Sequence, residues 1–166
     1  MMLRPMIRTD LAGLWPIFKA VCGAGLTLVQ DETTTAEAFE AYWTDRGGEQ
    51  WTAVVEERVV GGFTLRSNHP GRGAHVGTAT YIVAEHARSQ GVGTELALRS
   101  LDRAHALGFT AIQFNFVVST NEGALRLWRK LGFEIVGTLP RAFRHPQGAF
   151  VDAYVMHRNI HPKECQ

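Results

Sequence analysis

Two glycines that follow an arginine mark the stretch of this sequence best suited to chemistry. The run Arg88-Ser-Gln-Gly-Val-Gly93 comes after a β-rich segment that ends at Val83, and an amphipathic helical segment begins at its glycines. Glycine lets the backbone turn with its N–H groups uncovered, and a helix N-terminus adds unpaired amides and the positive end of a dipole. The turn therefore suits a phosphate group, with Arg88 adding a positive charge. A tight turn that binds nothing is the other interpretation that a single G-x-G run allows.

Other phosphate-binding patterns do not fit this turn. A Walker loop requires Gly-Lys-Ser/Thr, whereas Gly93 is followed by Thr94 and Glu95. A dinucleotide fingerprint requires a third glycine where the sequence has Leu96. The pattern that fits is R-x-x-G-x-G directly after a strand.

Two asparagines are the next polar residues that could contact a ligand. Asn115 interrupts the apolar run Ile112–Val118, and a buried amide requires hydrogen-bond partners. Asn121 lies in the polar cluster Ser119–Glu122, whose spacing fits the start of a helix. For Asn121, helix capping and ligand contact are both open.

The elements that must position these residues alternate between strand-like and helix-like periodicity, which predicts one α/β or α+β domain. Strands are expected over residues 3–8, 51–56, 59–66, 75–83, 110–118, 133–139 and 149–157. Helices are expected from Asp10, as the capping residue, to Gly23, from Thr33–Thr35 to Gly47, over residues 91–107, and from Ser119 to Gly132. The strand over 110–118 is apolar on both faces and is expected at the centre of the sheet. A loop over Pro140–Gly148 joins the last two strands.

Composition and charge exclude several classes of protein. The chain has 166 residues, of which 45% are hydrophobic and 20% charged, as in one soluble globular domain. Its 17 basic and 16 acidic side chains give a formal net charge of +1, without the basic excess of a general polyanion binder. No apolar run reaches the length of about 18 residues that a membrane helix needs, and Met1–Asp10 does not resemble a signal peptide. We therefore expect neither a nucleic-acid nor a membrane partner.

Cysteine and histidine usage gives no framework for a metal. Cys22 and Cys165 are far apart and form no C-x-x-C pair, and the seven histidines form no H-E-x-x-H pattern. Sparse cysteine is typical of a reducing compartment. We expect a cytoplasmic protein with no metal site, in which both thiols are buried or inert.

Two motifs together resemble one family. Arg88 to Gly93 looks like the pyrophosphate loop of the GNAT superfamily of acyl-CoA N-acyltransferases. Downstream, Asn121-x-x-Ala124 followed by Leu127-Trp128-x-x-Leu131-Gly132-Phe133 resembles the N-x-x-A…Y-x-k-x-G-F signature of the same superfamily. The two motifs occur in the expected order within Val76–Gly137, and the expected element order covers nearly the whole chain.

The resemblance implies an α/β (α+β) GNAT fold, a mixed and strongly twisted sheet of six or seven strands with helices on both faces. It implies a single domain over residues 1–160, followed by a C-terminal tail over 161–166. The strands over 76–83 and 110–118 would be a parallel pair that splays apart, with the pantetheine of acetyl-CoA in the gap. Since side chains and hydrogen-bonding groups alternate along a strand, Tyr81 and Val83 would share the edge that pairs with it. The Val83 N–H would also face the thioester carbonyl as an oxyanion donor.

By this resemblance, acetyl-CoA is the co-substrate and an amine attacks it directly, without a cysteine nucleophile and without a metal. The residues implied in binding acetyl-CoA are Tyr81, Val83, Arg88, Ser89, Gln90, Gly91, Val92, Gly93, Thr94, Asn121 and Trp128. The residues implied in catalysis are Asn115, Thr78 and Val83. Asn115 would face the acceptor or an ordered water from the splayed central strand.

The sequence departs from the family pattern at two positions. Many GNAT enzymes place a glutamate base where this chain has Thr78, which can hydrogen-bond a substrate carboxylate, hold a water or simply pack. The tyrosine that often protonates the leaving thiolate is Trp128 here, which either packs against the acyl end or belongs to the core. A thiol with a pKa near 8.5 leaves readily without such an acid.

The C-terminal segment Gly137–Met156 narrows the expected acceptor. Together with the run FNFVVSTN it resembles GNAT relatives that acetylate small amino-acid-like amines, of the phosphinothricin and azetidine-2-carboxylate type. We expect an N-acetyltransferase with a small-molecule amine as its partner, and a homodimer is left open. The alternatives are a protein acetyltransferase, acting on an N-terminus or a lysine, and a CoA-binding sensor without catalytic activity.

Overall fold

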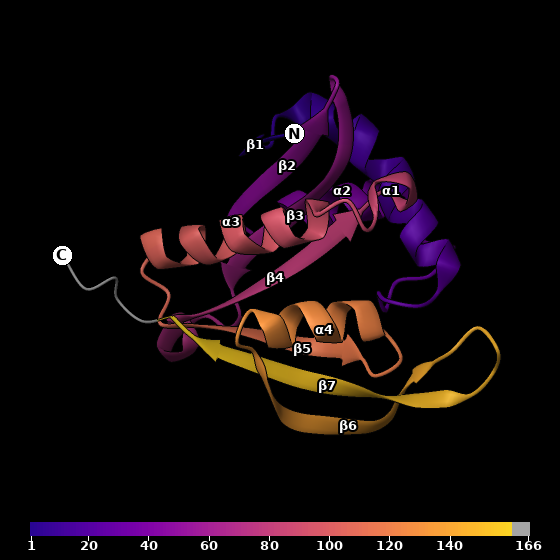
Figure 1. Cartoon of the computed structure of the whole chain (residues 1–166), viewed down its shortest axis with the longest axis vertical. Coiled ribbons are helices and arrows are strands. Elements are labelled where there is room, and N and C mark those ends of the chain that lie inside the picture. The colour runs from indigo at the N-terminus through magenta and orange to yellow at the C-terminus, as the bar shows by residue number, and fades with distance from the viewer. Residues whose placement is uncertain (161–166) are drawn as a thin grey trace.

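The computed structural model describes residues 1–160, in which one twisted sheet carries helices on both faces (Figure 1). The helices are α1 (Leu11–Ala24), α2 (Ala36–Thr44), α3 (Val92–Ala106) and α4 (Glu122–Lys130). The strands are β1 (Met2–Pro5), β2 (Glu49–Val55), β3 (Arg58–Ser67), β4 (Val76–Val83), β5 (Ala111–Val118), β6 (Glu134–Arg144) and β7 (Phe150–Asn159). Cys165 and the rest of the predicted tail, residues 161–166, lie outside the described residues.

The strands form one mixed sheet in the order β1-β2-β3-β4-β5-β7-β6, as the expected fold class requires. Every neighbouring pair is antiparallel except β4 and β5, which are parallel. Strand β5 lies between β4 and β7, which agrees with its apolar character on both faces.

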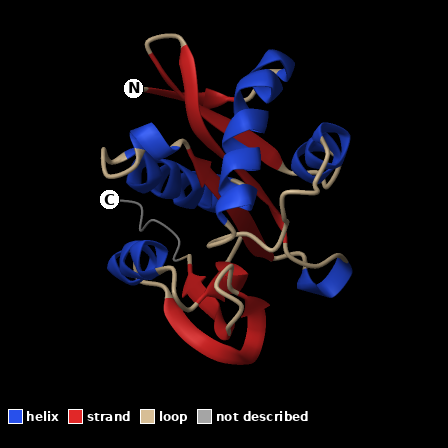
Figure 2. Ribbon diagram, turned by 90° about the vertical axis from the view of Figure 1, so that its right-hand side faces the viewer, coloured by secondary structure: helices blue, strands red, loops and turns tan. Residues whose placement is uncertain are grey.

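Two neighbouring residues of β4 show that the helices cover opposite faces of the sheet. The Thr80 hydroxyl is 3.0 Å from the Tyr42 hydroxyl of α2, whereas the Tyr81 hydroxyl is 2.7 Å from Ser100 Oγ of α3. Because successive side chains of a strand point to opposite faces, α2 and α3 lie on different sides. Figure 2 shows the strands running between helices on either side.

The parallel pair in the middle of the sheet opens along its length. Strands β4 and β5 pair only through Val76↔Ala111 and Gly77↔Ile112. Beyond Phe114 the pairing of β5 with β7 shifts register before it resumes at Val117, which marks a β-bulge. The expected splay is therefore present, and it widens toward the carboxyl ends of both strands (Figure 1).

Two expected boundaries are wrong. The expected loop over Pro140–Gly148 is shorter, because β6 continues to Arg144. This strand forms the edge of the sheet, where a proline costs no ladder hydrogen bond, and its pairing shifts register between Leu139 and Phe143. The first strand stops at Pro5 rather than Arg8, because residues 8–10 form a 3-10 turn.

Asp10 does not cap α1 as expected. Its carboxylate accepts hydrogen bonds from the Arg4 guanidinium at 2.6 and 2.8 Å and from the Ile7 N–H at 3.0 Å. The expected cap of the second helix does form, since Thr35 Oγ1 accepts a hydrogen bond from the Ala38 N–H at 3.2 Å.

No helix within residues 1–160 is both long and apolar enough to cross a membrane.

Candidate functional site

A cleft of about 730 Å³ occupies the gap between β4 and β5. Its walls come from the loop after α1, the end of β3, strands β4 and β5, the loop before α3, and α4. It brings together most of the predicted site residues, namely Thr78, Tyr81, Val83, Arg88, Ser89, Gly91, Gly93, Thr94, Asn115, Asn121 and Trp128. The side chains of Gln90 and Val92 are not part of it, because the Gln90 amide donates to the His86 carbonyl at 2.7 Å and Val92 is buried.

The glycine turn at one end of the cleft has a row of free backbone donors. Gly91 adopts a φ of 83° and Ser89 a φ of 60°, so the chain turns tightly before α3 begins. Within the described residues no acceptor is found for the N–H groups of residues 89–94, and the first helical bond of this turn runs from the Glu95 N–H to the Gly91 carbonyl at 3.0 Å. Arg88 is exposed beside them. The turn is thus equipped to bind an anion such as a phosphate.

Strand β4 presents an unpaired edge to the cleft. The Ala84 N–H donates to the Val60 carbonyl of β3 at 2.8 Å. Because backbone groups alternate in direction along a strand, the N–H groups of Val83 and Tyr81 point the other way, toward β5. Pairing with β5 ends at Gly77, so this edge is open to an extended ligand.

The Tyr81 side chain is built into the fold rather than offered to a ligand. Ser100 Oγ donates its hydrogen to the Ala97 carbonyl at 2.7 Å, so the Tyr81 hydroxyl is the donor in its bond with Ser100. Burial raises the pKa of Tyr81 well above its ordinary value, and the bond to Ser100 opposes this only in part. A phenol held in this way does not exchange protons near neutral pH.

Trp128 is both a core residue and part of the cleft wall. It is 8% exposed, and its ring centroid lies 4.6 Å from that of Phe114 and 4.9 Å from that of Tyr81. It also lines the cleft. The two interpretations of Trp128 therefore hold together, and neither supplies an acid for a leaving group.

Asn115 is exposed, so the expectation of a buried amide is wrong. The bulge in β5 places this side chain where β4 and β5 have separated. It forms a reciprocal amide pair with Asn68, donating at 2.6 Å and accepting at 3.2 Å, and it accepts from Gln113 Nε2 at 2.8 Å. The pair links the loop after β3 to β5, and of its two residues Asn115 lines the cleft.

Asn121 caps α4. Its Oδ1 accepts a hydrogen bond from the Ala124 N–H at 3.2 Å, as the polar cluster in the sequence indicated. The residue also lines the cleft, so capping does not remove it from contact with a ligand.

The chemistry of the cleft is limited by which ionisable groups line it. Among the described residues that line it, none is Asp, Glu, His or Cys, and its charged side chains are Arg66, Arg88 and Arg126. Thr78 is 8% exposed, and its side chain points to the same face of the sheet as that of Thr80. A threonine hydroxyl cannot serve as a base near neutral pH. A reaction in this cleft must therefore move protons through water or hydroxyl groups.

Cys22 is not available as a nucleophile. Its side chain is buried, and this burial, with Asp31 nearby, raises the pKa of Cys22 to about 11. The thiol is therefore protonated at neutral pH. Within residues 1–160 no three His, Cys, Asp or Glu side chains come together as a metal site.

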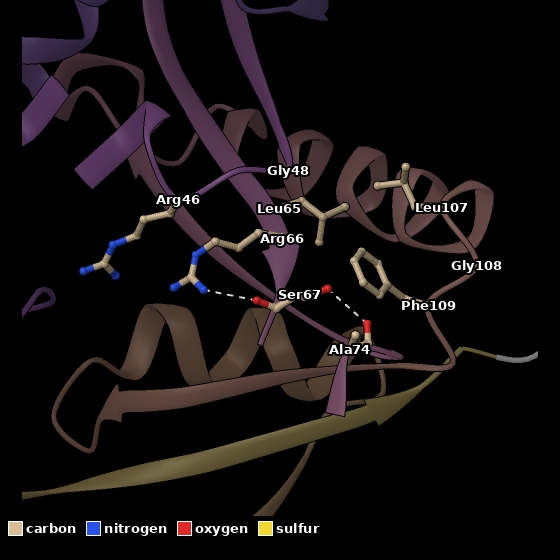
Figure 3. Close-up of a pocket in the computed structure, with 9 residues that line it drawn as sticks. All are labelled: Arg46, Gly48, Leu65, Arg66, Ser67, Ala74, Leu107, Gly108 and Phe109. Carbon is tan, nitrogen blue, oxygen red and sulfur yellow. Dashed lines mark hydrogen bonds between the residues drawn. The ribbon is translucent and has the colours of Figure 1, made fainter. Parts of the chain in front are cut away.

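Sequence reasoning missed Arg66, Tyr42 and Gln30, which also line the cleft. Arg66 ends a β-strand and Tyr42 lies on an amphipathic helix, positions where solvated and core side chains are common. Only the pairing of β3 with β4 and the packing of α2 on them bring these residues to the site. A smaller hollow of about 420 Å³, drawn in Figure 3, shares Arg66 with the cleft.

Comparison with known proteins gives a family match over most of the chain. The sequence matches the acetyltransferase (GNAT) family over residues 14–133. It is 36% identical over 98 residues to N-acetyltransferase aca1 of Schizosaccharomyces pombe, a match that covers 58% of this chain and 47% of that protein. The chain spans less than half the length of this relative and of a second curated relative from yeast.

Other matches extend over nearly the whole chain. The L-methionine sulfoximine/L-methionine sulfone acetyltransferase of Pseudomonas aeruginosa is 27% identical over 160 residues, covering 92% of this chain and 91% of the relative. The solved structure of a GCN5-related N-acetyltransferase from Kribbella flavida is 40% identical, with a TM-score of 0.91, and the match covers 95% of this chain and 96% of that one.

Proposed function

The chain belongs to the acetyltransferase (GNAT) family, and on that premise we propose that it transfers the acetyl group of acetyl-CoA to the amine of a small molecule. One observation carries the proposal. A turn with free backbone donors and an unpaired strand edge open into the same cleft. An anionic, extended ligand with an acyl group at its end matches both features.

The residues of the cleft fit acetyl-CoA. The N–H groups of residues 89–94 would hold the pyrophosphate, with Arg88 beside it. The β4 edge at Tyr81 and Val83 would pair with the pantetheine, and Asn121 and Trp128 would line its path. When bound, acetyl-CoA supplies an activated acetyl group on a thioester.

In the proposed reaction, the acceptor nitrogen forms a bond to the acetyl carbon while the C–S bond breaks. The nitrogen loses a proton to water, and the sulfur leaves as a thiolate that takes up a proton from water. The Val83 N–H would donate to the acetyl oxygen as negative charge develops there. Thr78 and Asn115 would position the acceptor or the water that carries the proton.

Two other functions compete with this one. A protein acetyltransferase that binds basic peptides needs acidic side chains near its acceptor, and the described residues that line the cleft include none. A CoA-binding sensor agrees with Thr78 and Trp128 standing where acid–base residues are usual in the family. The names of relatives that acetylate L-methionine sulfoximine or an L-amino acid support a small acceptor and an active enzyme. A cytoplasmic location, for which acetyl-CoA supply and sparse cysteine are the support, is part of the proposal.

The test is release of the CoA thiol from acetyl-CoA in the presence of single amines. The panel includes amino acids, aminoglycoside antibiotics and polyamines, with mass spectrometry of each product. We expect acceptor-dependent thiol release and a product heavier by one acetyl group for at least one small amine. Tight binding of acetyl-CoA without turnover on any amine would instead favour the sensor.

A further inference from the structure

We propose that the acceptor carries a carboxylate next to its amine and that Arg66 binds this carboxylate. The inference rests on the proposed acetyltransferase function and names the chemical class of the acceptor. It makes Arg66 a residue that determines specificity. The argument depends on where Arg66 lies, on its lack of an anionic partner, and on the polar atoms that share its cleft.

Arg66 lies on the side of the cleft that acetyl-CoA does not need. It pairs directly with Thr78 in the register of β3 and β4, so both side chains project from the same face of the sheet. This is the α2 face, where Thr80 meets Tyr42. Thr78 is separated from Val83 by about 16 Å of strand, at roughly 3.3 Å per residue, so Arg66 is remote from the phosphate-binding turn.

Arg66 is a half-buried cation without a carboxylate partner. Its hydrogen bond runs from Nη1 to the carbonyl of the next residue, Ser67, at 3.2 Å. In the described part of the chain it forms no ion pair within 4.0 Å, whereas Arg4 and Arg103 each have a carboxylate at 2.6 Å. Burial, and then the nearby charge of Arg46, lower the pKa of Arg66, while Tyr42 opposes them. A bound anion beside the guanidinium would oppose both effects, because an opposite charge favours the charged form.

Arg46 adds a second positive charge near Arg66, in the smaller hollow that the two residues line together. Figure 3 shows both guanidinium groups directed away from the apolar side chains of Leu107 and Phe109. The Arg46 guanidinium lies 4.7 Å from the centre of the Tyr42 ring, and the Tyr42 hydroxyl is engaged with Thr80. Neither arginine forms an ion pair with a carboxylate within residues 1–160, and two adjacent cations of this kind favour a ligand that brings its own negative charge.

The same cleft also offers free acceptors for an amine. Gln30 Oε1 and Thr27 Oγ1 are buried and have no hydrogen-bond partner among the described residues, and both residues line the cleft. An amine supplies the N–H donors that these two oxygens lack. Free donors on Arg66 and free acceptors in the loop after α1 are the two kinds of hydrogen-bond partner that an amino acid requires.

The test compares amino acids with the amines that remain when their carboxylate is removed. L-Leucine is paired with isoamylamine, L-phenylalanine with phenethylamine, and L-methionine sulfone with its decarboxylated amine. We expect kcat/KM of the native enzyme to favour at least one amino acid over its amine by tenfold or more. Arg66→Gln should lower kcat/KM for that amino acid at least thirtyfold, mainly through KM, and change the value for the amine less than threefold. Arg66→Lys should restore part of the preference.

Arg58→Gln is the matched control, because Arg58 lies exposed at the other end of the same strand. This variant should leave kcat/KM unchanged for both the amino acid and its amine. Two results would overturn the inference and leave the acetyltransferase function intact. One is an equal kcat/KM of the native enzyme for the amines and their amino acids. The other is an equal loss of kcat/KM for both in Arg66→Gln. If no amine of either set is acetylated, the proposed function fails for these acceptors. Calorimetry then measures whether the same amino acids bind to the CoA complex. Binding that is lost in Arg66→Gln supports the carboxylate site at Arg66, and no binding to the native protein overturns it.

Discussion

Cys22 carries the simplest residue-level consequence of the structure. Its pKa of about 11 and its burial keep it a neutral thiol, and it is not among the residues that line the cleft. We expect a Cys22→Ala, Cys165→Ala double variant to keep its turnover per folded molecule. Its free energy of unfolding should fall by about 1 kcal/mol, because a small buried side chain is shortened.

Steady-state rates and intact mass test this expectation. A folded double variant without activity, or an acetylated cysteine found by mass spectrometry during turnover, would show that the reaction passes through the enzyme rather than directly to the amine.

The residues that sequence reasoning placed well are those whose role depends on local chain geometry. Gly91 needs a left-handed backbone at a helix start, and Asn121 caps the next helix, and both follow from a few neighbouring residues. Arg66 could not be identified in this way. Its partnerless charge becomes visible only when β3 pairs with β4 and α2 covers them.

At the scale of elements, the splay of β4 from β5 creates the cleft, and the Asn68–Asn115 pair joins the loop after β3 to a residue that lines it. Either Asn115→Ala or Asn68→Ala removes the two hydrogen bonds between these amides, and Asn115→Ala also removes the exposed bond from Gln113 Nε2. We therefore expect similar, modest losses of stability, about 1 kcal/mol for each. If Asn115 also positions the acceptor or its water, kcat/KM of Asn115→Ala should be about tenfold lower than that of Asn68→Ala. This difference corresponds to roughly 1.4 kcal/mol of transition-state stabilisation.

Melting temperature, acetyl-CoA affinity and kcat/KM measured on one preparation of each variant separate these effects. Equal kcat/KM values for the two variants would show that Asn115 has only a structural role.

The same elements show where strand and loop assignments from sequence succeed and fail. The strands around the cleft were expected within one or two residues, because each is a short run rich in β-branched and aromatic residues between turn residues. The extension of β6 through Pro140 and the exposure of Asn115 depend on edge position and on a bulge, which only pairing with β7 determines. Such long-range pairings leave no periodic signal in the segment itself.

At the scale of the whole molecule, the described lining of the cleft combines positive charge with the absence of a side-chain base. The acceptor amine, with a pKa of about 9–10, must then lose its proton to solvent rather than to the enzyme. We expect kcat/KM to rise with pH up to the pKa of the acceptor itself. Two acceptors whose amine pKa values differ by about one unit should give profiles displaced by the same amount. A shared inflection near pH 7 for both acceptors would reveal an enzymic base instead.

The central claim is that acetyl-CoA binds the turn before α3, and Gly91→Glu tests it most directly. Gly91 and Gly108 lie at the two ends of α3 with φ values of 83° and 79°, and nothing lies within 4 Å of a Cβ added at either. Glutamate therefore causes similar backbone strain at both sites, but only at Gly91 does its carboxylate meet the proposed pyrophosphate. By calorimetry, we predict that Gly91→Glu weakens acetyl-CoA binding at least about a hundredfold, or roughly 2.7 kcal/mol, while Gly108→Glu retains native affinity. Native affinity in a folded Gly91→Glu variant would contradict the account.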